Sequence, residues 1–112
     1  MRDEDRIRLR HMIDAANDAV SFAHGRTRDD LDSDRQLAMA LVKCVEIVGE
    51  AASQVSPDAQ DEVPGLPWDD IVNMRHRLVH AYYDVNLEIL WRTVRDDLPP
   101  LIRTLRTVLG AD

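Results

Sequence analysis

Apolar residues recur along the chain at spacings of three and four, the period of one face of an α-helix. The first such stretch runs from about Asp3 to His24 and is followed by Gly25, which favours a helix end. A polar stretch then leads to Ser33-x-x-Gln36, a capping-box pattern that predicts the start of a second helix. The expected buried faces are Leu9, Met12, Ile13, Ala16, Val20 and Ala23 in the first helix, and Leu37, Leu41, Val45, Val48, Ala52 and Val55 in the second.

Prolines divide the second half of the chain. Ser56-Pro57 is expected to end the second helix and to cap a short helical turn through Gln60. A loop over residues 63–67 holds two prolines and a glycine. A third helix is expected to start at Trp68, with Ile71, Val72, Leu78 and Val79 on its apolar face, and the next connection is expected after Tyr83.

Asn86 is the expected N-cap of the last helix, which continues toward Gly110. Pro99 cannot donate a hydrogen bond to the carbonyl of Arg95, and its ring crowds that turn, so a kink is expected there. The chain has no alternating β-branched run bounded by hairpin signals and no internal repeat. These patterns predict an all-α fold, an antiparallel four-helix bundle with a short extra helical turn, as a single domain over residues 1–112.

Composition narrows the possible functions. The 112 residues include 14 Lys and Arg and 21 Asp and Glu, for a net charge of −7, which argues against a protein that coats nucleic acid nonspecifically. The single cysteine, Cys44, excludes an intramolecular disulfide and a zinc site built from cysteines. The sequence shows no signal peptide and no run near the ~18 apolar residues of a membrane span, so a cytoplasmic location without membrane contact is expected.

The densest polar cluster covers residues 73–83 and collects two arginines, two histidines and two tyrosines. Arginine offers a planar, permanently charged fork for phosphate oxygens, and histidine titrates near neutral pH. Such a cluster can position a phosphodiester and move protons. The alternative is a solvated face at a helix C-terminus, where the helix dipole favours cations.

Within this cluster, Arg75, His80 and Tyr82 form the pattern R-x4-H-x-Y. The pattern resembles the motif of the HepT-like ribonuclease toxins, small helical proteins of the HEPN superfamily, in which a polar residue such as His76 often follows the arginine. Similar flanking segments are Val48-Gly49-Glu50-Ala51-Ala52, Pro67-Trp68, Val85-Asn86, Leu90-Trp91 and Asp97-Leu98-Pro99. Asn86 is a departure, because many relatives have Asp at this place, but the change affects a helix cap and no catalytic residue.

The resemblance implies RNA cleavage that needs no metal or other cofactor. The 2′-hydroxyl attacks the adjacent phosphate and leaves a 2′,3′-cyclic end, with His80 as general base or acid and Arg75 stabilising charge on the phosphorane. His76 is either a second proton carrier or a residue that orients the backbone.

Helix geometry limits how these residues can meet. On one straight helix Arg75 and His80 would lie roughly 140° apart around the axis and about 7.5 Å apart along it. Either the helix ends near His80 or the site combines residues of two subunits. The resemblance favours the second arrangement as a homodimer whose two motifs face one cleft.

The resemblance also implies a toxin–antitoxin pair of the type VII kind. The expected partner is a minimal nucleotidyltransferase antitoxin that uses ATP and Mg²⁺ to transfer AMP to Tyr82. On an unbroken helix Tyr82 would lie within about 20° of the direction of Arg75, and Tyr83 about 80° away. Phosphate added at Tyr82 would compete with RNA for Arg75.

Other interpretations are weaker. His76 and His80 have the spacing of a helical zinc pair, but no H-E-x-x-H pattern or third ligand is evident, so no metal site is expected. Glu50 either belongs to a helix-packing stripe with Gly49 or holds an arginine of the motif. Cys44, Trp68 and Trp91 are expected in the core.

Two other function classes remain. The runner-up function is a noncatalytic helical module that docks onto a nucleotidyltransferase. The net charge disfavours an isolated nucleic-acid-binding adaptor.

Overall fold

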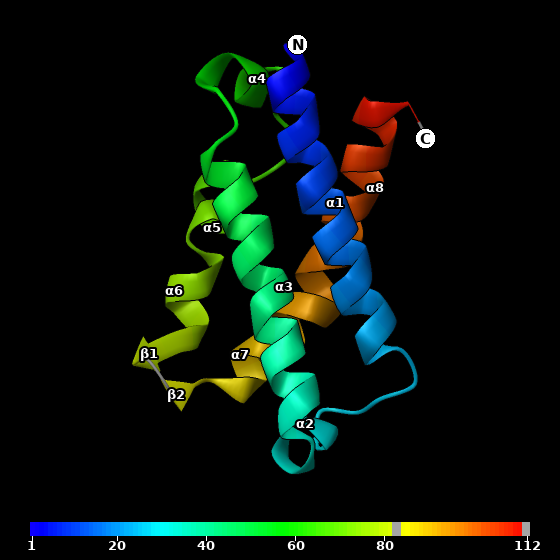
Figure 1. Cartoon of the computed structure of the whole chain (residues 1–112), viewed down its shortest axis with the longest axis vertical. Helices are drawn as coiled ribbons and strands as arrows, with labels where there is room; N and C mark the ends of the chain where they lie inside the picture. Colours follow the sequence, from blue (N-terminus) through cyan, green and yellow to red (C-terminus); the bar gives the residue numbers. More distant parts are fainter. Residues whose placement is uncertain (82–83, 111–112) are drawn as a thin grey trace.

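The computed structural model describes residues 1–81 and 84–110, and of residues 79–81 the backbone alone. Two long helices, α1 (Asp3–Ala23) and α3 (Arg35–Ser53), lie side by side and antiparallel at its centre (Figure 1). The shorter helices α5 (Trp68–Val72) and α6 (Met74–Leu78) pack against α3, and α8 (Leu98–Leu109) packs against α1. The predicted all-α fold is therefore confirmed.

The helical hairpin, defined here as α1, α3 and the connection between them, forms where the apolar pattern predicts it. Leu9 and Met12 of α1 and Leu41 and Val45 of α3 are completely buried, because the apolar faces of the two helices pack together. Gly25 follows α1 with φ +73°, a left-handed conformation that glycine adopts without strain.

The connection between α1 and α3 differs from the prediction at two points. A short helix, α2 (Asp30–Ser33), interrupts the expected loop and is anchored by Leu31, which is buried. The N-cap of α3 is Asp34 and not Ser33, since the Asp34 carboxylate accepts a hydrogen bond from the Leu37 N–H at 3.0 Å. Arg26 also pairs with Asp34 at 2.8 Å, an additional contact that favours this carboxylate as the cap.

Ser56 caps the short helix α4 (Pro57–Asp61), as predicted, with its Oγ accepting from the Ala59 N–H. The backbone N–H and the hydroxyl of Ser56 donate hydrogen bonds to the Asp5 carboxylate at 2.9 and 2.8 Å. These bonds tie the start of α1 to the start of α4. The backbone N–H of Ser56, and then its hydroxyl, lower the pKa of Asp5 below the ordinary value.

The third predicted helix is divided in two. The backbone N–H and the side-chain amide of Asn73 donate to the Asp69 carbonyl at 3.1 and 2.9 Å, and α5 ends there. Asparagine competes with the helix for backbone groups in this way, so the apolar spacing predicts a continuous helix that the side chain of Asn73 interrupts. The second piece, α6, ends at Leu78.

A short antiparallel pair of strands, β1 (Val79–Ala81) and β2 (Asp84–Val85), follows α6. Val79 pairs with Val85, and the Asn86 N–H donates to the Leu78 carbonyl at 2.6 Å. The sequence gives no signal for these strands, because each is too short to show alternation.

The last helical stretch contains α7 (Leu87–Arg92), a π-helical segment η1 (Thr93–Asp97) and α8. Asn86 caps α7 as predicted, accepting from the Ile89 N–H at 3.0 Å. The Leu98 N–H donates to the Thr93 carbonyl, five residues back, just before Pro99 and Pro100. The expected interruption thus takes the form of a π segment, a common cause of helix bending.

The buried apolar residues form one cluster to which the long helices, α5, α6, α7 and α8 all contribute. No helix among the described residues has the length and hydropathy needed to span a membrane.

Candidate functional site

Arg75 lies on α6 and reaches toward the hairpin. Its Nε is 3.4 Å from Oε1 of Glu46 on α3, and the two side chains are 49% and 33% exposed. An ion pair this exposed contributes little to stability, at most about 1 kcal/mol. Its main effect is to hold the guanidinium against α3 while leaving it accessible to a ligand.

Arg75 lines a groove of about 390 Å³ between α1, α3 and α6. We refer to this groove as the Arg75 groove. Its lining residues are Arg8, His11, Lys43, Glu46, Ile47, Glu50, Ala51, Gln54 and Arg75. Arginine and lysine together outnumber the carboxylates in this lining, although the whole chain carries a net charge of −7. The groove is thus a locally positive site on an acidic protein.

Glu50 also lines the Arg75 groove, but it does not pair with the arginine. Its Oε1 accepts a hydrogen bond from Nε2 of Gln54 at 3.1 Å. Glu46, one helical turn earlier on the same face, is the residue that pairs with Arg75. Of the two interpretations of Glu50, the contact with the motif arginine is made instead by Glu46, and Glu50 has a partner four residues along the chain.

Gly49 confirms the expected helix packing. A Cβ at this position would lie 3.2 Å from the Ile71 carbonyl oxygen and 3.4 Å from that of Val72. Any larger residue would push α5 away from α3. This close approach brings α6, which follows α5 after a single residue, to the distance at which Arg75 reaches Glu46.

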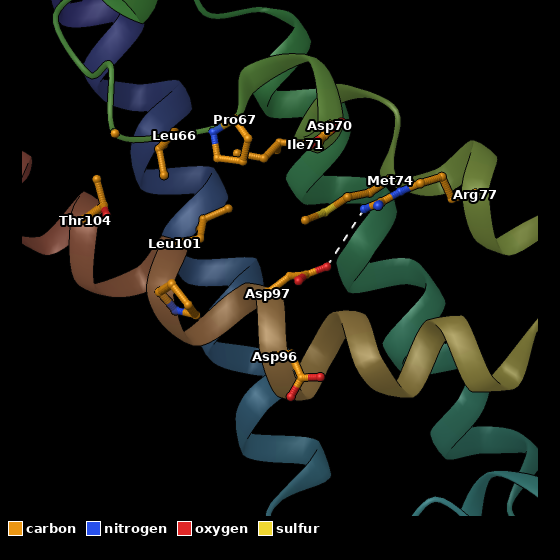
Figure 2. A pocket seen from close by; sticks show the side chains of 12 residues that line it. Leu66, Pro67, Asp70, Ile71, Met74, Arg77, Asp96, Asp97, Leu101 and Thr104 are labelled. Atoms are coloured by element: carbon orange, nitrogen blue, oxygen red, sulfur yellow. Dashed lines mark ion pairs between the residues drawn. The ribbon is translucent and has the colours of Figure 1, made fainter.

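Arg77 belongs to a different site. Its Nη2 is 3.9 Å from Oδ2 of Asp97 on η1, and Figure 2 shows this ion pair at a pocket of about 250 Å³. The apolar part of its lining includes Leu66, Ile71, Met74 and Leu101. Residues two apart on a helix diverge by about 200° around the axis. The two arginines of the motif region therefore face different neighbours, and only Arg75 lines the groove.

His80 stands on β1, two residues beyond the end of α6. The first of the two geometric alternatives is thus confirmed: the helix ends before His80, so the 140° separation does not apply. The side chain of His80, and Tyr82 and Tyr83 as a whole, lie outside the described residues. The helical argument that set Tyr82 in the direction of Arg75 no longer holds, because α6 does not extend that far. His76 lies on α6 with an exposed side chain.

The expected core residues are where the pattern places them. Cys44 is buried, and desolvation raises the pKa of its thiol, as suits a packing residue and not a nucleophile. Trp68 and Trp91 are half-buried and packed against the core, with Nε1 of Trp68 donating to the Val63 carbonyl at 3.0 Å. Among the described residues, no three His, Cys, Asp or Glu side chains are grouped so that they could hold a metal ion.

Comparison with known families identifies the family of the chain. The family described as ribonuclease HepT-like matches residues 12–108, which include α6 and the whole R-x4-H-x-Y motif. The chain belongs to the HepT-like ribonuclease family. The resemblance read from Arg75, His80 and Tyr82 is thereby confirmed, and so is the assignment of the chain as a ribonuclease.

Individual HepT-like relatives agree with this assignment. The chain is 36% identical to a probable ribonuclease HepT of Thermococcus cleftensis over 65% of this chain and 66% of the relative. It is 26% identical to a candidate RNase of Methanocaldococcus jannaschii over 89% of this chain and 92% of the relative. A candidate RNase of Caldanaerobacter subterraneus subsp. tengcongensis is 29% identical over 90% of each chain. No solved structure matches the chain significantly.

Proposed function

We propose that this HepT-like chain is a metal-independent endoribonuclease that acts as the toxin of a type VII-like toxin–antitoxin pair. The observation that carries the proposal is the position of Arg75, half-exposed in a groove with more arginine and lysine than carboxylate, on a chain that is otherwise acidic. RNA is a polyanion, and such a groove is where its phosphates would be attracted.

The proposed reaction uses two side chains of the motif. A general base removes the proton of the RNA 2′-hydroxyl, and the oxygen attacks the adjacent phosphorus. The bond from phosphorus to the 5′-oxygen then breaks, a general acid protonates that oxygen, and a 2′,3′-cyclic phosphate remains. His80 serves as base or acid, and Arg75 stabilises the negative charge that develops on the phosphorane oxygens. Neither role requires a metal ion or another cofactor.

His76 is proposed to assist, either as the second proton carrier or by orienting the backbone near Arg75. Its exposed position on α6, one residue after Arg75, allows contact with a bound strand. Glu50 lines the same groove, and its role there is secondary to that of Glu46.

The homodimer is part of the proposal. Two copies of the chain would bring two Arg75 grooves to one cleft and so gather positive charge that a single acidic chain lacks. Light scattering at micromolar concentration is expected to give the dimer mass. A monomer with full activity would contradict this part.

Regulation is proposed to act through Tyr82. A minimal nucleotidyltransferase antitoxin would transfer AMP from Mg²⁺-bound ATP to this tyrosine, and the new phosphodiester would compete with RNA for Arg75. The support for Tyr82 over Tyr83 is the motif alone. Co-expression with the antitoxin, followed by tandem mass spectrometry, should find added AMP on Tyr82, and Tyr82→Phe should escape silencing. AMP on Tyr83 would contradict the choice.

The experiment that tests the central proposal is cleavage of total RNA by the purified chain, wild type beside His80→Ala. Loss of one acid–base group is expected to slow cleavage by about 10²- to 10⁴-fold. EDTA should have little effect, and the product should carry a 2′,3′-cyclic end. Activity of His80→Ala within about tenfold of wild type, or a strict need for a divalent metal, would contradict the mechanism.

A further inference from the structure

We infer that the Arg75 groove binds RNA phosphates that neighbour the one being cleaved, and that Arg8 of α1 and Lys43 of α3 are the residues that bind them. The inference rests on the proposed function in one respect, because it takes Arg75 as the residue at the reacting phosphate. Neither Arg8 nor Lys43 belongs to the R-x4-H-x-Y motif. Both enter the site only because the hairpin packs beside α6.

The positions of the cations suit a second phosphate. Lys43 precedes Glu46 by three residues on α3, so it lies about one turn, or 4.5 Å along the axis, from the carboxylate that holds Arg75. Arg8 approaches the same groove from α1, on the face that also carries His11. The three cations are thus supplied by three separate helices around one groove.

The charges of the groove are arranged so that Arg8 and Lys43 remain available. Glu46 is paired with Arg75, and Glu50 accepts a hydrogen bond from Gln54. Within the described part of the chain, neither Arg8 nor Lys43 forms an ion pair. An arriving phosphate would therefore not have to displace a carboxylate from either residue.

The apolar part of the lining favours a nucleotide strand over an isolated phosphate. Ile47 lines the groove and is 38% exposed, so it offers apolar surface there, whereas Ala51, one turn further along α3, is buried. A ribose or a base can cover such a surface while its phosphate contacts Lys43. The groove is also long, since its α3 residues extend from Lys43 to Ala51, about 12 Å along the axis, and Gln54 lines it just beyond the end of α3.

Arg75 retains donors for the reacting phosphate while it is held by Glu46. A guanidinium carries five N–H groups, and the contact with Glu46 is made through Nε. The remaining donors can bind a phosphate oxygen. Glu46 is thus a positioning residue for Arg75, and Arg8 and Lys43 bind the strand beside it.

The test measures binding and cleavage separately, with the full chain. Binding is measured by fluorescence anisotropy with a labelled single-stranded RNA oligonucleotide that is 2′-O-methylated throughout, which removes the attacking hydroxyl. The variants are Lys43→Gln and Arg8→Gln. The control is Arg103→Gln, which removes the same charge from an exposed position of α8 that is not part of the groove lining.

Each groove variant is expected to weaken RNA binding about three- to tenfold at fixed salt, and the control should stay near wild type. The slope of log affinity against log salt should fall by about 0.7 for each phosphate contact that is lost. In cleavage assays with unmodified RNA, KM should rise by a similar factor with little change in kcat, since these contacts bind substrate and transition state alike. Lys43 is exposed, so Lys43→Gln tests the inference even if the half-buried Arg8 also affects stability.

Two different results separate this inference from the proposed function. If the wild-type chain cleaves RNA and the groove variants match Arg103→Gln in affinity and salt slope, the groove assignment is wrong and the proposed function stands. If the chain binds RNA through Lys43 and Arg8 but cleaves none, the proposed function is wrong, and the groove stands as an RNA-binding surface without a reacting phosphate at Arg75. If the wild-type chain does not bind the oligonucleotide, the groove assignment is overturned.

Discussion

The helical hairpin and the segment that follows it over residues 68–92 are built differently. We call the latter the motif segment. The hairpin consists of two helices of 21 and 19 residues, whereas the helices α5, α6 and α7 of the motif segment have five, five and six residues. The hairpin buries continuous apolar faces. The motif segment exposes Arg75, His76 and Arg77 in direct succession.

The difference suits a division in which the hairpin provides stability and the motif segment provides the proposed site. The two long helices α1 and α3 contribute a large share of the buried apolar cluster through one face each. The breaks at Asn73 and after Leu78 leave the exposed Arg75, His76 and Arg77 on a helix of five residues, and His80 on β1 beyond its end. We therefore expect substitutions in the two regions to affect different measurements.

The largest expected effect is the loss of activity in Arg75→Ala. Arg75 is proposed to stabilise the charge that develops on the phosphorane, so its removal should lower kcat by about 10²- to 10³-fold. The free energy of unfolding should change by less than about 1 kcal/mol, because the ion pair with Glu46 is exposed. RNA cleavage and urea denaturation measure the two quantities. If Arg75→Ala instead lowers the free energy of unfolding substantially, or leaves cleavage unchanged, the proposed division between a stabilising hairpin and a functional motif segment is wrong.

The reverse pattern is expected for Leu41→Ala in the hairpin. Leu41 is completely buried, and its truncation should lower the free energy of unfolding by about 2–5 kcal/mol through lost burial and a residual cavity. At temperatures where the variant stays folded, kcat should remain near wild type. The matched control is Ile89→Ala, at a half-buried position of the motif segment, which should cost less. Equal costs at both positions would show that the two regions contribute alike to stability.

A smaller effect is expected at the cap of α7. Asn86→Ala removes the acceptor for the Ile89 N–H and should destabilise the chain by about 1 kcal/mol. Asn86→Asp should keep most of the wild-type stability, because aspartate caps helices as well as asparagine does. Thermal denaturation compares the three proteins. If Asn86→Asp is as unstable as Asn86→Ala, the side chain acts through something other than the cap.

The smallest expected effect is a loss of stability at acidic pH that arises from two carboxylates of the hairpin. The Ser56 N–H holds the pKa of Asp5 below its ordinary value of 3.8, and Arg26 does the same for Asp34. A carboxyl with a lowered folded-state pKa stabilises the fold fully above 3.8 and loses this contribution as the pH falls through the lower folded value. Urea denaturation from about pH 6 to about pH 2 should therefore show a flatter acid decline for Asp5→Asn than for wild type. If Asp5→Asn loses stability with falling pH as steeply as wild type does, groups other than Asp5 cause the acid sensitivity.

Much of the fold and the family could be predicted from the sequence because the signals are local. The periodic apolar positions indicated the two long helices, and Ser56 and Asn86 were identified as caps because a cap depends on residues within one turn. The family followed from Arg75, His80 and Tyr82, since a motif of fixed spacing remains recognisable in the chain itself.

The tertiary structure decided which residues meet across helices. Local pattern could not choose Glu46 over Glu50 as the partner of Arg75, because both lie on the same face of α3 and only the seating of α6 distinguishes them. The local pattern also could not predict the ion pair between Arg77 and Asp97, because Asp97 lies 20 residues further along the chain. The Arg75 groove, with Arg8 and Lys43 from two different helices, arises only when the hairpin packs against α6. Sequence spacing fixes the neighbours within a turn, whereas contacts between helices depend on the packing of the whole core.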